Sequence, residues 1–152
     1  MLEGPGATYT YHVNGKPPAA NGRGLFGHGE RGRLSFINAS SMSIFDVRIP
    51  DLSMSVVQSD GNDVEPVAVD EFRIGTAETY DVIVTPTEER AFAIFAQAED
   101  RSGFAGGNRA PRAGLPAPVP PTHSPPFPSL SALGTWALQA YRQEHGPRPL
   151  CC

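Results

Sequence analysis

The residues best suited to chemistry in this chain are four histidines and two cysteines. The histidines are His12, His28, His123 and His145, and no two of them lie within four positions of each other. They cannot chelate a metal through adjacent turns of one helix or alternate positions of one strand, so a zinc or copper site would need the fold to bring them together. Cys151 and Cys152 are adjacent at the C-terminus. No disulfide framework is predicted from such a pair.

Nucleophilic and phosphate-binding patterns are also lacking. Ser35, Ser53 and Ser59 have no G-x-S-x-G motif around them, and a serine nucleophile needs a base and an orienting group nearby. The glycine-rich stretch 22–29 does not lead from a strand into a helix, as a phosphate-binding loop must.

Charged side chains gather between and within the expected strands. A general acid–base pair among the carboxylates is conceivable, but solvated turn residues are the favoured interpretation. The arginines alternate with apolar residues, which predicts that they lie on the solvent-facing side of a sheet and pair with those carboxylates. The carboxylates are Asp60, Asp63, Glu65, Asp70 and Glu71, and the arginines are Arg31, Arg33, Arg48 and Arg73.

Composition narrows the class of protein. The chain has 152 residues, a formal net charge of −4 and 16 prolines, most of them after residue 110. The length suffices for one domain with a core, and the charge gives no basic field for nucleic acid. No stretch is apolar for long enough to cross a membrane. Residues 1–6 lack the basic start and apolar centre of a signal peptide, so we expect either a cytosolic protein or a piece of a longer exported one.

Short apolar runs cut by Gly, Pro, Asn or Asp dominate the first hundred residues, which is the pattern of strands and turns. We expect strands over 8–13, 33–38, 43–49, 53–58, 66–69, 71–74, 79–84 and 91–98, with hairpin turns at Asn14-Gly15 and Asp60-Gly61. Residues 16–30 are expected to form a loop that packs Phe26 inward, and residues 100–107 a glycine-rich turn. The roughly even spacing predicts an all-β, two-sheet antiparallel sandwich of Greek-key type, with a small closed barrel as the alternative.

The C-terminal part has a different character. Residues 110–128 are rich in proline and are expected to be extended and largely solvated. Residues 129–145 are the one helical candidate, with Leu130, Leu133, Leu138 and Tyr141 partly on one face. The expected organisation is a stub at 1–7, a domain at 8–108, and a proline-rich linker and mostly irregular tail at 109–152.

Several blocks of the sequence resemble a known family. Residues 34–40, Leu-Ser-Phe-Ile-Asn-Ala-Ser, resemble a strand of the second cupredoxin (plastocyanin-like) domain of multicopper oxidases. Residues 11–15, 56–66 and 75–84 are similar to further blocks of that domain, in the same order and at the same spacing. Residues 44–50 and 69–75 resemble the copper-resistance, CopA-type branch of the family. The resemblance covers roughly residues 8–121.

This resemblance implies a cupredoxin-like fold and a parent oxidase of three domains in the periplasm. Such oxidases take electrons from cuprous ion or phenol-like substrates and reduce dioxygen to water with bound copper. Blue copper requires a cysteine thiolate with two histidines, yet the chain has no H-x-H, no H-C-H and no cysteine within the predicted domain. We therefore expect a bridging domain that lies between the first and third domains, with copper in the parent and no catalytic, cofactor or metal residue here.

Two other functions stay open from the residues alone. One is a stand-alone β-sandwich that binds a protein partner through an exposed face. The other is a weak copper chaperone that uses the histidines and the Cys151-Cys152 pair. An isolated bridging domain is also expected to expose apolar surface where its neighbours belong, and therefore to self-associate.

Overall fold

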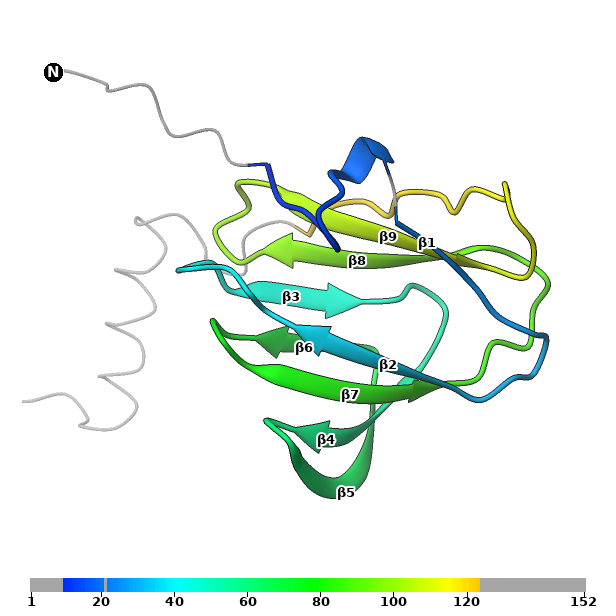
Figure 1. The fold of residues 1–152 in the computed structure, drawn as a ribbon, viewed down its shortest axis with the longest axis horizontal. Helices are drawn as coiled ribbons and strands as arrows, with labels where there is room; N and C mark the ends of the chain where they lie inside the picture. Colours follow the sequence, from blue (N-terminus) through cyan, green and yellow to red (C-terminus); the bar gives the residue numbers. More distant parts are fainter. Residues whose placement is uncertain (1–9, 21, 124–152) are drawn as a thin grey trace, which may run out of the picture. The chain divides into compact units, whose positions relative to one another are not determined.

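The computed structural model describes residues 10–20 and 22–123, and it forms a β-sandwich within them (Figure 1). The helical content there is one short 3-10 turn, Pro18–Ala20. The strands are β1 (Gly22–Leu25), β2 (Gly32–Ile37), β3 (Phe45–Arg48), β4 (Met54–Ser59), β5 (Asn62–Val69), β6 (Glu71–Ile74), β7 (Thr79–Val84), β8 (Phe92–Ala98) and β9 (Phe104–Ala110).

These strands form two separate sheets. One has the order β1-β9-β8-β3-β6 and the other the order β2-β7-β4-β5. Only the β4–β5 and β8–β9 connections stay within a sheet, and every other connection crosses to the opposite sheet, as Greek-key topology requires. The prediction of an all-β sandwich is confirmed, and the closed barrel is excluded because β2 and β5 end one sheet and β1 and β6 end the other.

Three local predictions are wrong. Residues 22–25 are a strand and not a loop, and they pair in parallel with β9. Phe104–Ala110 is also a strand, so the glycine-rich turn is confined to the residues before it. Of the strand expected at 8–13, residues 10–13 form no regular strand, and only Val13 makes an isolated bridge, with Lys16. Pairing on both sides of β9 overrides the poor strand propensity of its glycines.

Both predicted hairpin turns are confirmed. Asn14 and Gly15 have φ of 50° and 74°, and Val13 and Lys16 exchange backbone hydrogen bonds of 2.9 and 3.0 Å. Asp60 and Gly61 have φ of 48° and 78° and connect β4 to β5. Positive φ at both central positions is the geometry of a tight hairpin turn, and Asn-Gly and Asp-Gly tolerate it best.

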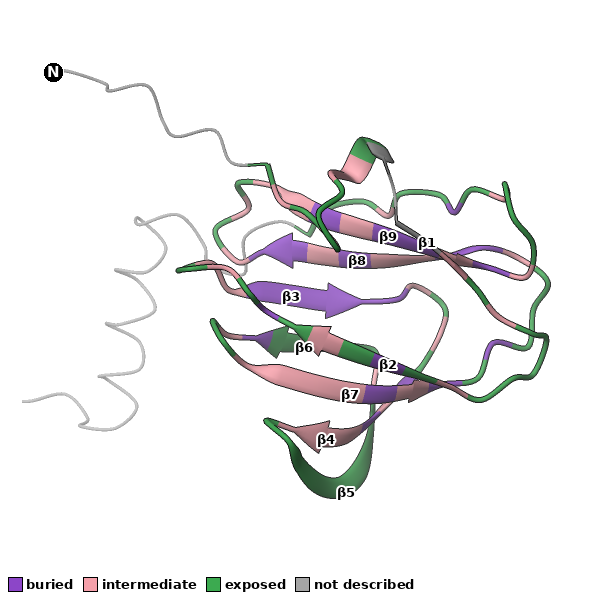
Figure 2. Ribbon diagram, in the orientation of Figure 1, coloured by how far each residue is buried: buried purple, intermediate pink, exposed green. Residues whose placement is uncertain are grey.

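The core lies between the two sheets (Figure 2). Its larger cluster is apolar and comes from both sheets: Leu34, Ile49, Met54, Val56, Val82, Val84 and Phe92. Phe26 packs against this cluster, with its ring centroid 5.8 Å from that of Phe92, as predicted. A second cluster, Phe45, Val47, Ile74 and Ala98, lies nearer the ends of β3 and β8.

After β9, residues 111–123 run back over the sheet in irregular conformation. Most of residues 111–123 are exposed, but Ala117 is buried with Ala91 and Ala110. The carbonyl oxygens of Leu115 and Pro121 accept bonds from Asn108 and Arg48, so the segment is fastened at two points.

The predicted stub at 1–7, the helix at 129–145, His145 and the Cys151-Cys152 pair lie outside the described residues. The chain divides into a unit of residues 1–122 and a second unit of residues 123–152. Among the described residues, no helix has the length and apolar character needed to span a membrane.

Candidate functional site

The histidines do not come together in the described part of the chain. His12 precedes the Asn14-Gly15 turn, His28 lies in the turn before β2, and His123 is the last described residue. No group of three or more His, Cys, Asp or Glu side chains among the described residues could hold a metal ion. A blue-copper centre needs a thiolate and two imidazoles, and the only cysteines of the chain are at 151 and 152. The donor set of the described residues therefore does not fit that centre.

The five carboxylates singled out from the sequence lie in turns and at strand edges. Asp60 accepts a 2.8 Å hydrogen bond from the backbone N–H of Thr79, and Asp63 accepts one of 3.0 Å from Gln58. Both carboxylates are exposed, as are Glu65, Asp70 and Glu71. The carboxylates are solvated, as predicted, but Asp63 and Glu65 lie in β5 and Glu71 in β6, so the interpretation as turn residues is wrong for these three.

The predicted arginines divide into two kinds. Arg33 lies on the exposed face of β2 and pairs with Asp81, as expected for a solvent-facing side. The pKa of Asp81 is lowered by its hydrogen bonds from Ser35 and Arg33. Arg48 pairs with Glu71 at 3.6 Å, as predicted, but it does not lie on a solvent-facing side, because its side chain is only 10% exposed. It lies over the ring of Phe95, 5.1 Å from the centroid, and beneath the proline-rich segment.

A buried ion cluster lies on the outer side of β3, and the sequence did not reveal it. The side chain of Asp46 is 8% exposed and accepts hydrogen bonds from Arg73 Nε at 2.8 Å and Arg101 Nη1 at 3.0 Å. Arg73 also pairs with Glu99 at 2.6 Å. Desolvation raises the pKa of Asp46, but the two guanidinium groups outweigh it and hold the pKa below its ordinary value. The cluster ties β3, β6 and the β8–β9 loop together.

Asn38 explains one of the family-like blocks in structural terms. It is 5% exposed, and its Nδ2 donates to the carbonyl oxygens of Ser43 and Ile74 at 2.8 and 3.2 Å. Its Oδ1 accepts from the backbone N–H and the hydroxyl of Ser40 at 3.1 and 2.7 Å. The amide is therefore fully hydrogen-bonded. Asn38 fixes the end of β2 against β3 and β6, which is a structural role.

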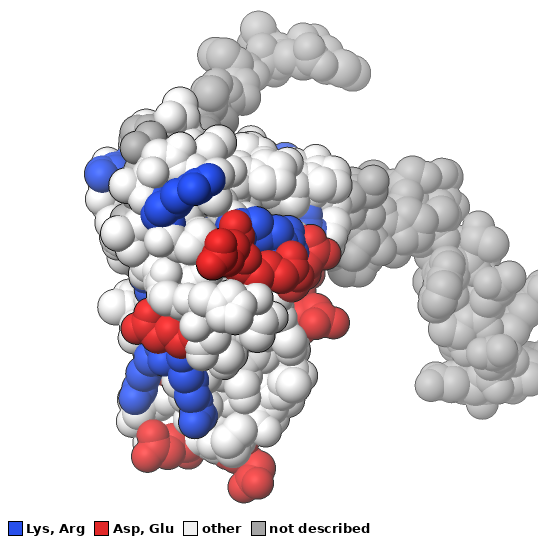
Figure 3. Space-filling model, turned by 90° about the vertical axis from the view of Figure 1, so that its right-hand side faces the viewer, with Lys and Arg blue, Asp and Glu red and all other residues white. Residues whose placement is uncertain are grey.

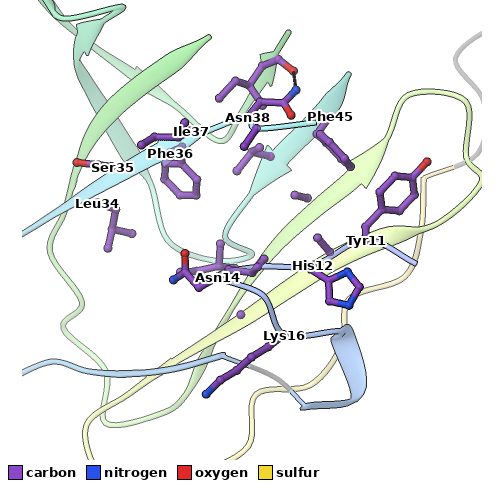
Figure 4. A pocket seen from close by; sticks show the side chains of 18 of the residues that line it. Tyr11, His12, Asn14, Lys16, Leu34, Ser35, Phe36, Ile37, Asn38 and Phe45 are labelled. Atoms are coloured by element: carbon purple, nitrogen blue, oxygen red, sulfur yellow. Dashed lines mark hydrogen bonds between the residues drawn. The ribbon is translucent and has the colours of Figure 1, made fainter. Parts of the chain in front are cut away.

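A groove with a volume of about 990 Å³ lies between β2 and the opposite sheet. We call it the β2 groove. Figure 4 shows β2 on one side and residues 11–16 on the other, with the ring of Phe36 directed toward the space between them. Its floor comes from β8 and β9 and includes Ile94, Ala96 and Ala105. Tyr11 closes one end through an edge contact with Phe45 and a 2.7 Å hydrogen bond to Ser102.

One face of the described residues carries charges of both signs. Figure 3 shows a face on which Lys and Arg side chains lie beside Asp and Glu side chains, without a continuous basic area.

Known proteins are similar to this chain over most of its length. A family model described as multicopper oxidase matches residues 2–116. The chain is 55% identical over 129 residues to copper resistance protein A of Pseudomonas syringae pv. tomato, which covers 85% of the chain and 21% of that protein. It is 50% identical over 144 residues to a copper resistance protein A homolog of strain DC3000, covering 95% of the chain and 24% of that protein.

A solved structure supports the same fold. The crystal structure of Fet3p, described as a multicopper oxidase that functions in iron import, aligns with a TM-score of 0.60 at 20% identity. The alignment covers 72% of this chain and 23% of that one. The cupredoxin-like β-sandwich is thus confirmed. The chain spans about a quarter or less of the length of the relatives it matches.

Proposed function

Because the chain belongs to the multicopper oxidase family, we propose that it is the bridging, second cupredoxin domain of a longer copper-resistance oxidase. Its role there is to hold the first and third domains in place, and it contributes no copper ligand of its own. The parent would oxidise cuprous ion or phenol-like substrates and reduce dioxygen to water in the periplasm, with copper bound by the other domains.

The observation that carries this proposal is the high identity over a short part of a longer relative. Identity of 55% spans 85% of the chain but only 21% of copper resistance protein A. Such a match is what one domain of a multidomain oxidase would give. The chemistry of the donor set supports the absence of copper ligands, since the chain has neither H-x-H nor H-C-H.

A chimera tests the scaffold role. Residues 8–121 of this chain replace the matching segment of the Pseudomonas syringae protein, and the purified chimera is assayed for copper content and oxidation of cuprous ion. We expect the copper content of the unmodified protein and a similar oxidation rate. A chimera that folds but lacks copper would show that the matching segment supplies ligands, and would overturn the proposal.

The chain alone is tested by titration with copper. We expect weak binding without the blue absorption of a thiolate–copper centre, and no oxidation of cuprous ion. Tight binding that is lost when Cys151 and Cys152 are removed would instead support the chaperone. Exposed apolar residues, including Ile37 at 70% and Met42 at 80%, favour self-association of the isolated chain. Light scattering over a range of concentrations measures it.

A further inference from the structure

The open edge of β2 is the starting point. Within the described residues, this strand ends its sheet and pairs with β7 alone. The backbone N–H of Asn38 donates to Glu78, and Leu34 and Phe36 lie opposite Val82 and Tyr80 in the same register. Since backbone groups alternate between the two edges of a strand, the N–H and C=O groups of Arg33, Ser35 and Ile37 point away from β7. They point toward the β2 groove.

The groove exposes side chains that belong to a sandwich interior. Phe36 and Ala96 pack against the second core cluster, and both also line the groove, together with Ile94 and Ala105. The six residues of β2 extend for about 20 Å at the usual rise of a strand. An extended peptide laid along β2 would satisfy its open edge and place every second side chain on this apolar floor.

The charge of the lining specifies the ligand further. The charged residues of the described lining are Lys16, Arg33 and Arg109. Asp81 neutralises Arg33, so Lys16 and Arg109 carry the positive charge of the groove. A strand with acidic residues at its ends would therefore complement the groove, whereas a basic strand would not.

We propose that the β2 groove is a strand-addition site for an extended segment of the parent oxidase that lies outside this chain. The segment has apolar side chains at alternate positions and acidic residues at its ends. This inference rests on the proposed function, because relatives extend to four or five times the length that the chain matches. It adds to the scaffold role a site, the β2 groove, at which another segment of the parent polypeptide adds a strand to the sandwich.

The test is backbone amide hydrogen exchange of the full chain, with and without the acetylated peptide Glu-Val-Thr-Val-Thr-Val-Glu. We expect exchange at Arg33, Ser35 and Ile37 to slow at least about tenfold at saturation. The amides of Leu34 and Phe36 are internal controls, because they already face β7. The same peptide with its alternate backbone nitrogens methylated cannot pair with β2 and should leave the exchange unchanged.

Two variants separate backbone pairing from side-chain effects. Ser35→Pro removes one edge donor and should weaken peptide binding about fivefold, the worth of one hydrogen bond. Ser35→Ala keeps that donor and loses only the hydroxyl, so it should bind like the unmodified chain. Ala96→Phe fills the floor of the groove and should abolish binding. Circular dichroism establishes that each variant is folded.

Three results would overturn the inference. The first is slow exchange at Arg33, Ser35 and Ile37 in the free chain. The second is equal slowing by the methylated peptide, or no slowing by either. The third is dimerisation that Ser35→Pro abolishes, which would assign the groove to a second copy of the chain. The experiment involves no copper, so its failure is distinct from failure of the chimera to load copper or oxidise cuprous ion.

Discussion

Replacing Asp46 by Asn tests the buried ion cluster. The substitution keeps the shape of the side chain and one acceptor, removes the negative charge and directs an amide N–H₂ toward guanidinium donors. Arg101 then loses its partner while its side chain stays 13% exposed. Its Nε already lacks a hydrogen-bond partner in the described structure. We therefore expect Asp46→Asn to destabilise the fold.

The size of the effect follows from burial. Breaking a buried ion pair by removing one partner costs about 3–5 kcal/mol. Arg73 is 48% exposed and retains Glu99, so water and that carboxylate compensate part of the loss. We expect a decrease of about 3 kcal/mol in the free energy of unfolding, near the lower end of that range. For a domain of this size the melting temperature should fall by about 10 °C.

The pH dependence gives an independent check. The pKa of Asp46 is lower in the folded state than in the unfolded state. The stabilisation of the fold by its carboxylate is therefore fully present above the unfolded-state pKa of about 3.9, and it is lost as the pH falls through the folded-state pKa. The difference in free energy of unfolding between the unmodified chain and Asp46→Asn should be constant from about pH 5 to 8. It should narrow below about pH 4. Urea unfolding followed by circular dichroism at each pH measures this difference.

Asp51→Asn is the matched control. Asp51 pairs with Arg90 at 3.2 Å, but its side chain is 73% exposed, so the same chemical change should cost at most about 0.5 kcal/mol. Equal effects of the two substitutions would refute the argument that burial makes the Asp46 cluster strong. A difference in free energy of unfolding between the unmodified chain and Asp46→Asn that stayed constant below pH 4 would show that the charge of Asp46 is not what stabilises the fold.

Three further substitutions test the strand ends, a turn and the proline-rich segment by thermal unfolding. Asn38→Ala removes four hydrogen bonds at a buried site, although the Ser43 carbonyl keeps a donor in the Ser40 hydroxyl. It should cost about 2–3 kcal/mol, whereas Asn62→Ala, which loses a single exposed hydrogen bond, should change stability little. Gly61→Ala places a side chain at φ of 78° and should cost about 1 kcal/mol, while Gly32→Ala, in a strand with only an ordinary contact to Val84, should cost less. Ala117→Asp buries a carboxylate and should cost about 2–4 kcal/mol, and a neutral effect would show that residues 111–121 do not pack on the sheet.

Strands with alternating apolar residues were predictable from the sequence because their pattern matches their burial. Thr79–Val84 is an example, with Val82 and Val84 buried between less buried neighbours. The same logic located the turns at Asn14-Gly15 and Asp60-Gly61, where positive φ restricts the residues that fit. Local chemistry determines these features, so a local pattern reveals them.

The missed features depend on partners that are distant in the sequence. The strand character of β1 and β9 comes from pairing with each other and with β8, and neither strand has the residues that favour an extended conformation alone. The Asp46 cluster joins residues 27 and 55 positions apart. The one local signal was the placement of Asp46 and Arg48 inside an apolar run, which a strand buried on both faces can hold only with charged partners.

The parallel pairing of β1 with β9 has a consequence for the order of folding. Gly22 lies opposite Gly107, so more than half of the chain must be arranged before the two strands can meet. Hairpins such as β4–β5 and β8–β9 close short loops and can form early, whereas β1 can dock only after β9 is in place. The N-terminal edge of that sheet should therefore be the last to fold. It should also be among the first parts to open in the native state.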